Sequence, residues 1–153
     1  MIALIPDPIA LDPLVEAVAH PEHGGLVTFL GTTRREATLR PVEALVYEAY
    51  EELALAELRA IAAEAEARFD ARVAIVHRTG RVAVGEPSVA VAASAGHRPA
   101  AFAACRHAID ELKRRAPIWK QDVHADGATS WQDGRGVVTP PATDPEHAHE
   151  PVR

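Results

Sequence analysis

The sequence predicts an α+β sandwich with a mixed or antiparallel sheet and two long helices. Two stretches, residues 51–69 and 99–115, carry apolar side chains at helical spacing, whereas the other apolar segments are short. Several of these short segments follow one another through brief turns, which favours antiparallel neighbours over a regular doubly wound fold. The length of 153 residues suits one domain whose apolar core needs no disulfide or metal for stability.

The first half of the chain alternates strands with helices. An apolar stripe indicates a helix over residues 9–20, and the longer helix over 51–69 combines such a stripe with strong helix formers. Gly31 ends a strand, and the polar, basic residues 32–41 after it are expected to form a loop. The strands of this half are expected over residues 2–5, 24–30 and 42–47.

The second half consists of strands around one long helix. Pro99 suits the first turn of that helix, Phe102 and Cys105 lie on its apolar face, and Pro117 ends it. The pair Asp126-Gly127 is a hairpin signal between the last two strands. The strands of this half are expected over residues 72–77, 81–84, 88–95, 118–123 and 129–132.

The folded body is expected to be a single domain over residues 1–136, followed by a Pro-rich, flexible tail over 137–153 that holds four of the 12 prolines. Metal-ligating side chains occur in this tail, but a flexible segment does not hold ligands in place, so no metal site is assigned. The side chains concerned are Glu146, His147, His149 and Glu150.

Composition excludes several classes of protein. The net charge of −6 argues against general nucleic-acid binding, which requires a strong basic excess. No apolar run is long enough to cross a bilayer, and the N-terminal residues do not resemble a secretory signal. Cys105 is the only cysteine, which excludes an internal disulfide and fits a reducing, cytoplasmic location. Motifs typical of nucleotide-binding loops, zinc peptidases and serine hydrolases are absent from the sequence.

Basic side chains gather in one part of this acidic chain. Residues 97–120 hold six lysines and arginines against two acids, and Lys113 and Lys120 are the only lysines of the chain. His97 and Arg98 stand where a strand passes into the start of a helix, a place that suits an anion. Arg34 follows another strand end. Together these residues suggest a cleft for a small anionic ligand.

Each of these residues also has a purely structural interpretation. Arg34 and Arg35 are equally typical of a solvated loop, and His97 with Arg98 of a covered helix start. Lys120 beside Trp119 is consistent with a cation resting on an aromatic ring. Arg114 and Arg115 favour a helix C-terminus whatever the function. His77 is expected to be a hydrogen-bonded structural histidine, and Cys105 an inert core thiol.

The ordered motifs of the body resemble the large, catalytic subunit of molybdopterin synthase, the MoaE-type family. The resemblance covers residues 24–132, and the motifs in their order make it specific. They are VTFLGTTRRE, LVYEAYEELA with its LxYExY pattern, VAIVHRTGRVAVGE, ASAGHRPAAF with its HRxxAF pattern, IDELKRRAPIWK and DGATSW.

The resemblance implies an α/β-hammerhead-type fold and a homodimer within a heterotetramer. It also implies a small ubiquitin-like partner, whose C-terminal Gly-Gly thiocarboxylate enters the site of the large subunit. Two sulfur atoms are delivered, one at a time, to cyclic pyranopterin monophosphate, which forms the dithiolene of molybdopterin in molybdenum cofactor biosynthesis. The family needs no metal and no organic cofactor for this step, so none is expected here.

The resemblance assigns roles to five residues. Lys113 and Lys120 match the catalytic lysine pair of the family, and Arg34, His97 and Arg98 match positions that bind the substrate phosphate and pterin. A lysine of lowered pKa can donate and accept protons, which an arginine cannot. We expect the pKa values of the two lysines to be lowered by like charge, with Arg34 and Arg98 contributing to that charge.

The sequence departs from the family pattern at one place near the site, and two other functions remain as alternatives. After Lys120 the family usually has a basic or polar residue and then Glu, whereas this chain has Gln121 and Asp122, so Asp122 is assigned no role. One alternative is a docking module that binds the ubiquitin-like partner without turnover. The other is an unrelated enzyme of a phosphate ligand, built around the same basic cleft. Dependence of activity on the partner distinguishes them.

Overall fold

The computed structural model describes residues 1–35 and 41–131, and it has two four-stranded sheets and three helices in that part of the chain. The expected tail, residues 137–153, and its Glu/His cluster lie outside the described residues. The first sheet contains the strands β1 (Ile2–Ile5), β4 (Ala71–Arg78), β6 (Pro87–Ala95) and β2 (Gly25–Thr32), in that spatial order. Only β1 pairs in parallel, with β4, so this sheet is mixed.

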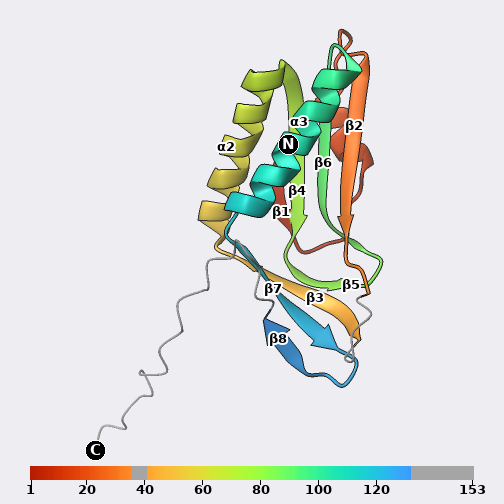
Figure 1. Cartoon of the computed structure of the whole chain (residues 1–153), viewed down its shortest axis with the longest axis vertical. Coiled ribbons are helices and arrows are strands. Elements are labelled where there is room, and N and C mark those ends of the chain that lie inside the picture. The colour runs from red at the N-terminus through yellow and green to blue at the C-terminus, as the bar shows by residue number, and fades with distance from the viewer. Residues whose placement is uncertain (36–40, 132–153) are drawn as a thin grey trace, which may run out of the picture.

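The second sheet is antiparallel and lies beyond the C-terminal end of α3 (Arg98–Arg115), below the first sheet in Figure 1. Its strands, in spatial order, are β5 (Gly80–Ala83), β3 (Val42–Ala49), β7 (Ile118–His124) and β8 (Thr129–Trp131). The α+β class, the mixed and antiparallel sheets and the two long helices are therefore confirmed.

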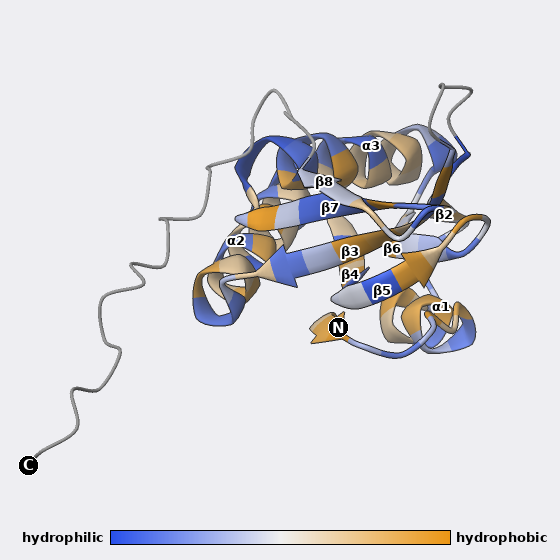
Figure 2. Ribbon diagram, turned by 90° about the horizontal axis from the view of Figure 1, so that it is seen from below, coloured by the Kyte–Doolittle hydropathy of each residue, from blue (hydrophilic) through white to orange (hydrophobic). Residues whose placement is uncertain are grey.

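The two long helices cover one face of the first sheet, and a short helix covers the other (Figure 2). Helix α2 (Glu51–Phe69) and α3 pack on β4 and β6 through a core that includes Leu58, Ile61 and Ile75. Buried alanines line the contact between these elements, so the helices and sheet approach closely. Helix α1 (Asp12–Val18) places Leu14 and Val18 on the opposite face.

Helix α1 is shorter than the helix predicted over residues 9–20. It begins one residue before Pro13, which fits the first turn because proline lacks an amide hydrogen that this turn would leave unused. It ends at Val18, three residues before Pro21, and the residue that precedes a proline disfavours helical dihedrals. The apolar stripe extends beyond the segment that these two prolines allow to be helical.

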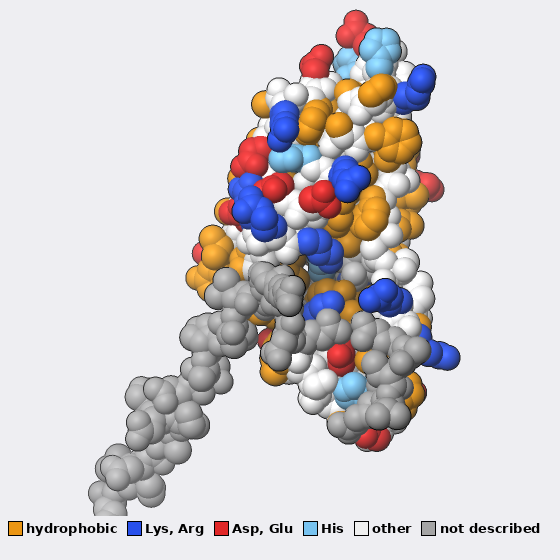
Figure 3. Space-filling view, in the orientation of Figure 1, with side chains coloured by type: hydrophobic (Ala, Val, Ile, Leu, Met, Phe, Trp, Pro, Cys, Tyr) orange, Lys and Arg blue, Asp and Glu red, His pale blue; other side chains and the backbone are white. Residues whose placement is uncertain are grey.

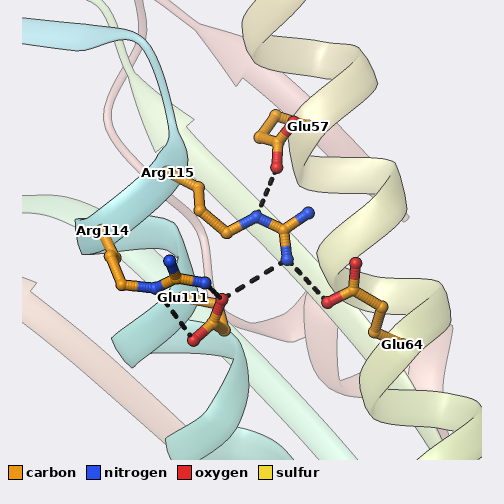
Figure 4. Close-up of polar contacts among 5 residues, drawn as sticks. All are labelled: Glu57, Glu64, Glu111, Arg114 and Arg115. Carbon is orange, nitrogen blue, oxygen red and sulfur yellow. Dashed lines mark hydrogen bonds and ion pairs between the residues drawn. The ribbon is translucent and has the colours of Figure 1, made fainter. Parts of the chain in front are cut away.

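The last turn of α3 is tied to α2 by ion pairs (Figure 4). Arg115 of α3 donates to Glu57 and Glu64 of α2, with 2.6 Å between its Nη1 and Glu64 Oε2, and it also pairs with Glu111 of its own helix. Arg114 pairs with Glu111 on the same helix. The sequence predicted only dipole stabilisation for both arginines, yet Arg115 also fixes the end of α3 that carries Lys113.

We predict that Arg115→Met lowers the melting temperature more at pH 7 than at pH 3.5. The arginine holds the pKa of Glu64 below its usual range, so this stabilisation is present above the ordinary glutamate pKa and is lost as pH falls through the lowered value. Thermal unfolding at both pH values measures the difference. Arg114→Met is the matched control, because Arg114 pairs within one helix, and an equal loss in both variants would contradict the prediction.

Candidate functional site

A pocket of about 220 Å³ lies where the two sheets and the C-terminal end of α3 meet. Figure 3 shows Lys and Arg side chains gathered around a hollow below the helices. The residues that line the pocket come from five elements and the segment after β2, which is why no single stretch of sequence encodes it. They are Gly31, Thr32, Thr33, Arg34, Val42, Leu45, Tyr47, Ser88, Lys113, Lys120 and Asp122.

Both lysines of the chain line this pocket. Lys113 lies in the last turn of α3, and Lys120 lies on β7, which begins directly after Pro117. Because Pro117 stops the helix, the chain turns and returns past its own helix end, which brings the second lysine back to the first. The spacing of seven residues therefore brings both lysines to one pocket.

The pKa of Lys113 is lowered, chiefly because the surrounding protein removes water from the ammonium group and then because of the charge of Lys120. Lys113 as a whole is exposed, but its side chain lines the pocket. A lowered pKa increases the fraction of neutral amine near neutral pH. Lys113 can therefore both give and take a proton, the property that general acid–base catalysis requires.

Arg34 lines the same pocket from the segment that follows β2. The backbone there is anchored, since the Thr33 amide donates to the Glu86 carbonyl at 2.9 Å and the Thr33 carbonyl accepts from the Gly85 amide at 2.7 Å. Gly31 is required for close packing, because a Cβ atom there would lie 2.6 Å from Val89 Cγ1. The neighbouring Arg35 is exposed and does not line the pocket.

His97 and Arg98 lie at the other end of α3. Fifteen residues separate Arg98 from Lys113, and at 1.5 Å of rise per residue the two positions are about 22 Å apart. The start of α3 packs tightly on β2, where a Cβ atom at Gly25 would lie 2.9 Å from Arg98 Cα. The expectation that Arg34 and Arg98 help to lower the pKa of Lys113 is wrong within one chain, because burial and then the charge of Lys120 lower it.

Four residues that were not predicted for the site also line the pocket, and they are Thr33, Tyr47, Ser88 and Asp122. Tyr47 had a signal, since it is the first tyrosine of the LxYExY motif. Its position opposite Lys120 in the β3–β7 pairing could not be known before the strands were placed in register. Asp122 is two residues beyond Lys120 on the same strand and therefore shares its face.

Two structural expectations are confirmed. His77 is buried, and its Nδ1 lies 2.7 Å from the Arg78 carbonyl oxygen, which can only accept a hydrogen bond. Burial lowers the pKa of His77 to about 4, so the ring is neutral near neutral pH. Cys105 is a buried thiol whose pKa is raised by burial to about 11, which leaves no thiolate to react.

Three features are not present among residues 1–35 and 41–131. Lys120 does not rest on the Trp119 ring, because successive strand residues point to opposite faces of a sheet. That part of the chain has no cluster of three or more His, Cys, Asp and Glu side chains placed to hold a metal ion. Nor do its helices include one long and apolar enough to cross a membrane.

The comparisons with known proteins agree with one another. The model of the MoaE protein family matches residues 4–115. A molybdopterin synthase catalytic subunit of Thermoplasma volcanium is 41% identical over 119 residues, which are 77% of this chain and 87% of that protein.

Two solved structures share the fold. The structure of molybdopterin synthase from Staphylococcus aureus matches with a TM-score of 0.82 and 30% identity, over 86% of this chain and 96% of that chain. A complex of subunits 1 and 2 of the molybdopterin-converting factor of Helicobacter pylori matches with a TM-score of 0.74. At 21% identity, over 89% of this chain and 92% of that one, it shows the fold alone.

We predict that Lys113 reacts with an amine-selective acylating reagent at lower pH than a free lysine does, because its pKa is lowered. With only two lysines in the chain, mass spectrometry separates the modified peptides from each other and from the N-terminus. Lys120→Met removes the like charge and should shift the labelling curve of Lys113 to higher pH. A curve that does not move would contradict the proximity of the two ammonium groups.

Proposed function

Because the chain belongs to the family of MoaE proteins, we propose that it is the catalytic subunit of a molybdopterin synthase. It takes sulfur from the C-terminal thiocarboxylate of a small ubiquitin-like partner and passes it to cyclic pyranopterin monophosphate. Two such transfers form the dithiolene of molybdopterin, and each leaves the partner with an ordinary carboxylate. The observation that carries the proposal is a single pocket that holds Arg34 and both lysines of the chain.

The pocket chemistry suits this reaction. Both substrates are anions, and the three cations around the pocket offset the repulsion between them. Arg34 contacts the substrate phosphate through its planar, forked guanidinium group. Lys113 contacts the thiocarboxylate and moves protons as the acyl and ring intermediates open, while Lys120 positions the substrate and shares proton transfer. No metal or organic cofactor takes part, and the lone reduced cysteine fits a cytoplasmic location.

His97 and Arg98 serve the pocket from a second copy of the chain. Strand β2 is an edge strand of the first sheet, and it is eight residues long. An unpaired edge of that length is a template for another strand. Large apolar side chains are exposed along it and on the adjoining face of α3, where a monomer would leave them in water. They are Leu26 (42% exposed), Phe29 (38%), Leu30 (43%) and Phe102 (61%).

Antiparallel pairing of the two β2 edges explains the separation of the five site residues. A two-fold axis near the middle of β2 places the Gly25 end of one copy beside the Arg34 end of the other. Arg98 packs on Gly25, so each α3 start then lies near the pocket of the other copy. We therefore place His97 and Arg98 in the site of the second subunit, with one ubiquitin-like partner docked at each end of the homodimer.

We predict that Lys113→Ala lowers the turnover number by about 10²- to 10⁴-fold in a reconstituted assay, because the general acid–base group is lost. The assay mixes the chain with a thiocarboxylated ubiquitin-like partner and cyclic pyranopterin monophosphate, and then detects the fluorescent oxidised derivative of molybdopterin by chromatography. Lys120→Arg tests whether charge alone is sufficient at the second position, in which case it should retain most activity.

Each outcome of this assay has a definite meaning. A Lys113→Ala variant with full activity would overturn the assigned role of Lys113. Wild-type protein that binds the partner but gives no product would support the docking-module alternative. Product formed without the partner would point to an unrelated enzyme of a phosphate ligand.

A mixing experiment tests the shared site. Lys113→Ala and Arg98→Ala are each expected to be nearly inactive, and their mixture should regain about a quarter of wild-type activity. Half of randomly formed dimers are hybrids, and each hybrid holds one intact pocket of two. The control mixes Lys113→Ala with the double variant Lys113→Ala/Arg98→Ala, which cannot form an intact pocket. No recovery in the first mixture would show that Arg98 does not act across the dimer.

A further inference from the structure

Tyr47 is the part of the LxYExY motif that the functions assigned above leave unexplained. It is 7% exposed, and it lines the pocket from β3. In the β3–β7 pairing Tyr47 lies directly opposite Lys120. Paired residues of neighbouring strands point to the same face with Cβ atoms about 5 Å apart, so the phenol and the ammonium stem are neighbours.

The Gly31 carbonyl oxygen determines the direction of the hydrogen bonds around Tyr47. The Ser88 hydroxyl donates to the Gly31 carbonyl oxygen at 3.2 Å, and a carbonyl can only accept. Ser88 has no second hydrogen, so the 3.1 Å contact between its Oγ and the Tyr47 hydroxyl is a donation from Tyr47. The only hydrogen of the phenol is thereby committed, and its oxygen can act toward the pocket only as an acceptor.

The surroundings keep this phenol neutral and in place. Burial raises the pKa of Tyr47, and the nearby Asp122 carboxylate adds to the rise. The Ser88 hydroxyl and then the Thr33 hydroxyl act in the opposite direction, but burial outweighs them and the pKa is raised overall. His77 contacts the Tyr47 ring edge-on, with 5.0 Å between ring centroids. Tyr47 is therefore neither a base nor a phenolate near neutral pH.

We propose that Tyr47 is a positioning residue for Lys120, whose ammonium group donates a hydrogen bond to the phenol oxygen. The Tyr47–Ser88–Gly31 chain joins β3 to β6 and to the end of β2, so the acceptor is held by three strands. An ammonium group directed by such an acceptor points into the pocket beside Lys113 rather than moving freely in water. The inference rests on the function proposed above, because it names a further residue of the same site.

The test compares Tyr47→Phe with Tyr50→Phe, the only two tyrosines of the chain. Tyr47→Phe keeps the ring and removes the acceptor, so the turnover number should fall by about 10- to 100-fold while KM for the partner stays unchanged. Tyr50 is 60% exposed, does not line the pocket, and should be replaceable without effect. Turnover of Tyr47→Phe equal to that of Tyr50→Phe would overturn the proposal.

The pH profile separates positioning from a purely structural role. A neutral acceptor favours the charged form of an amine, so its removal should move the alkaline limb of the turnover profile to lower pH. The other charged groups at the pocket are Arg34, Lys113 and Asp122, and neutral His77 lies behind the Tyr47 ring; all remain in the variant. An unchanged profile with a lowered melting temperature would assign Tyr47 a structural role and overturn the proposal.

Two further measurements keep the inference separate from the proposed function. Ser88→Ala leaves the Tyr47 oxygen in place, so it should lose less activity than Tyr47→Phe, and an equal or greater loss would contradict the acceptor role. If the wild-type chain has no synthase activity, acylation of Lys120 still tests the contact. Labelling should occur at lower pH in Tyr47→Phe than in Tyr50→Phe, and identical curves would overturn the contact.

Discussion

Two ammonium groups and a guanidinium repel one another in a pocket that is partly withdrawn from water, and the fold has to hold them together against that repulsion. It does so by attaching each cation to a different rigid element. Lys113 is carried by the last turn of α3, Lys120 by β7 and Arg34 by the anchored segment after β2. The repulsion also has a chemical effect, because the charge of Lys120 adds to burial in lowering the pKa of Lys113.

The rest of the structure supplies that rigidity. Alanines in α2, α3 and β6 let the helices and the first sheet approach closely, and the Arg115 ion pairs fix the end of α3 on α2. Pro117 then forces the chain out of the helix and into β7. The second sheet closes the pocket from the opposite side with Leu45, Tyr47 and Lys120.

The sequence predicted every described strand and helix to within a few residues, because each has a clear apolar pattern and most are bounded by Gly or Pro. It overestimated only α1, where the helix predicted over residues 9–20 extends beyond Asp12–Val18 at both ends. Lys113, Lys120 and Arg34 could be singled out from an unusual lysine usage and from the family motifs. Ser88 and Asp122 could not, and Tyr47 stood out only as a motif residue, because their place beside the lysines in one pocket depends on strand register and on how two sheets meet. The separation of Arg98 from Lys113 was within reach of the sequence, because the helix predicted over residues 99–115 already places them near its opposite ends.

Helix α3 has a role that its packing alone does not reveal. It carries Arg98 at its first turn and Lys113 at its last, and in the proposed dimer these two ends belong to different reaction sites. The length of the helix therefore sets the distance between the two pockets. A single residue inserted between its ends would rotate one end relative to the other by about 100° and lengthen it by 1.5 Å, which would misplace a cation even if the core absorbed the change. The number of residues in α3 is therefore under a stricter constraint than the identity of most of them.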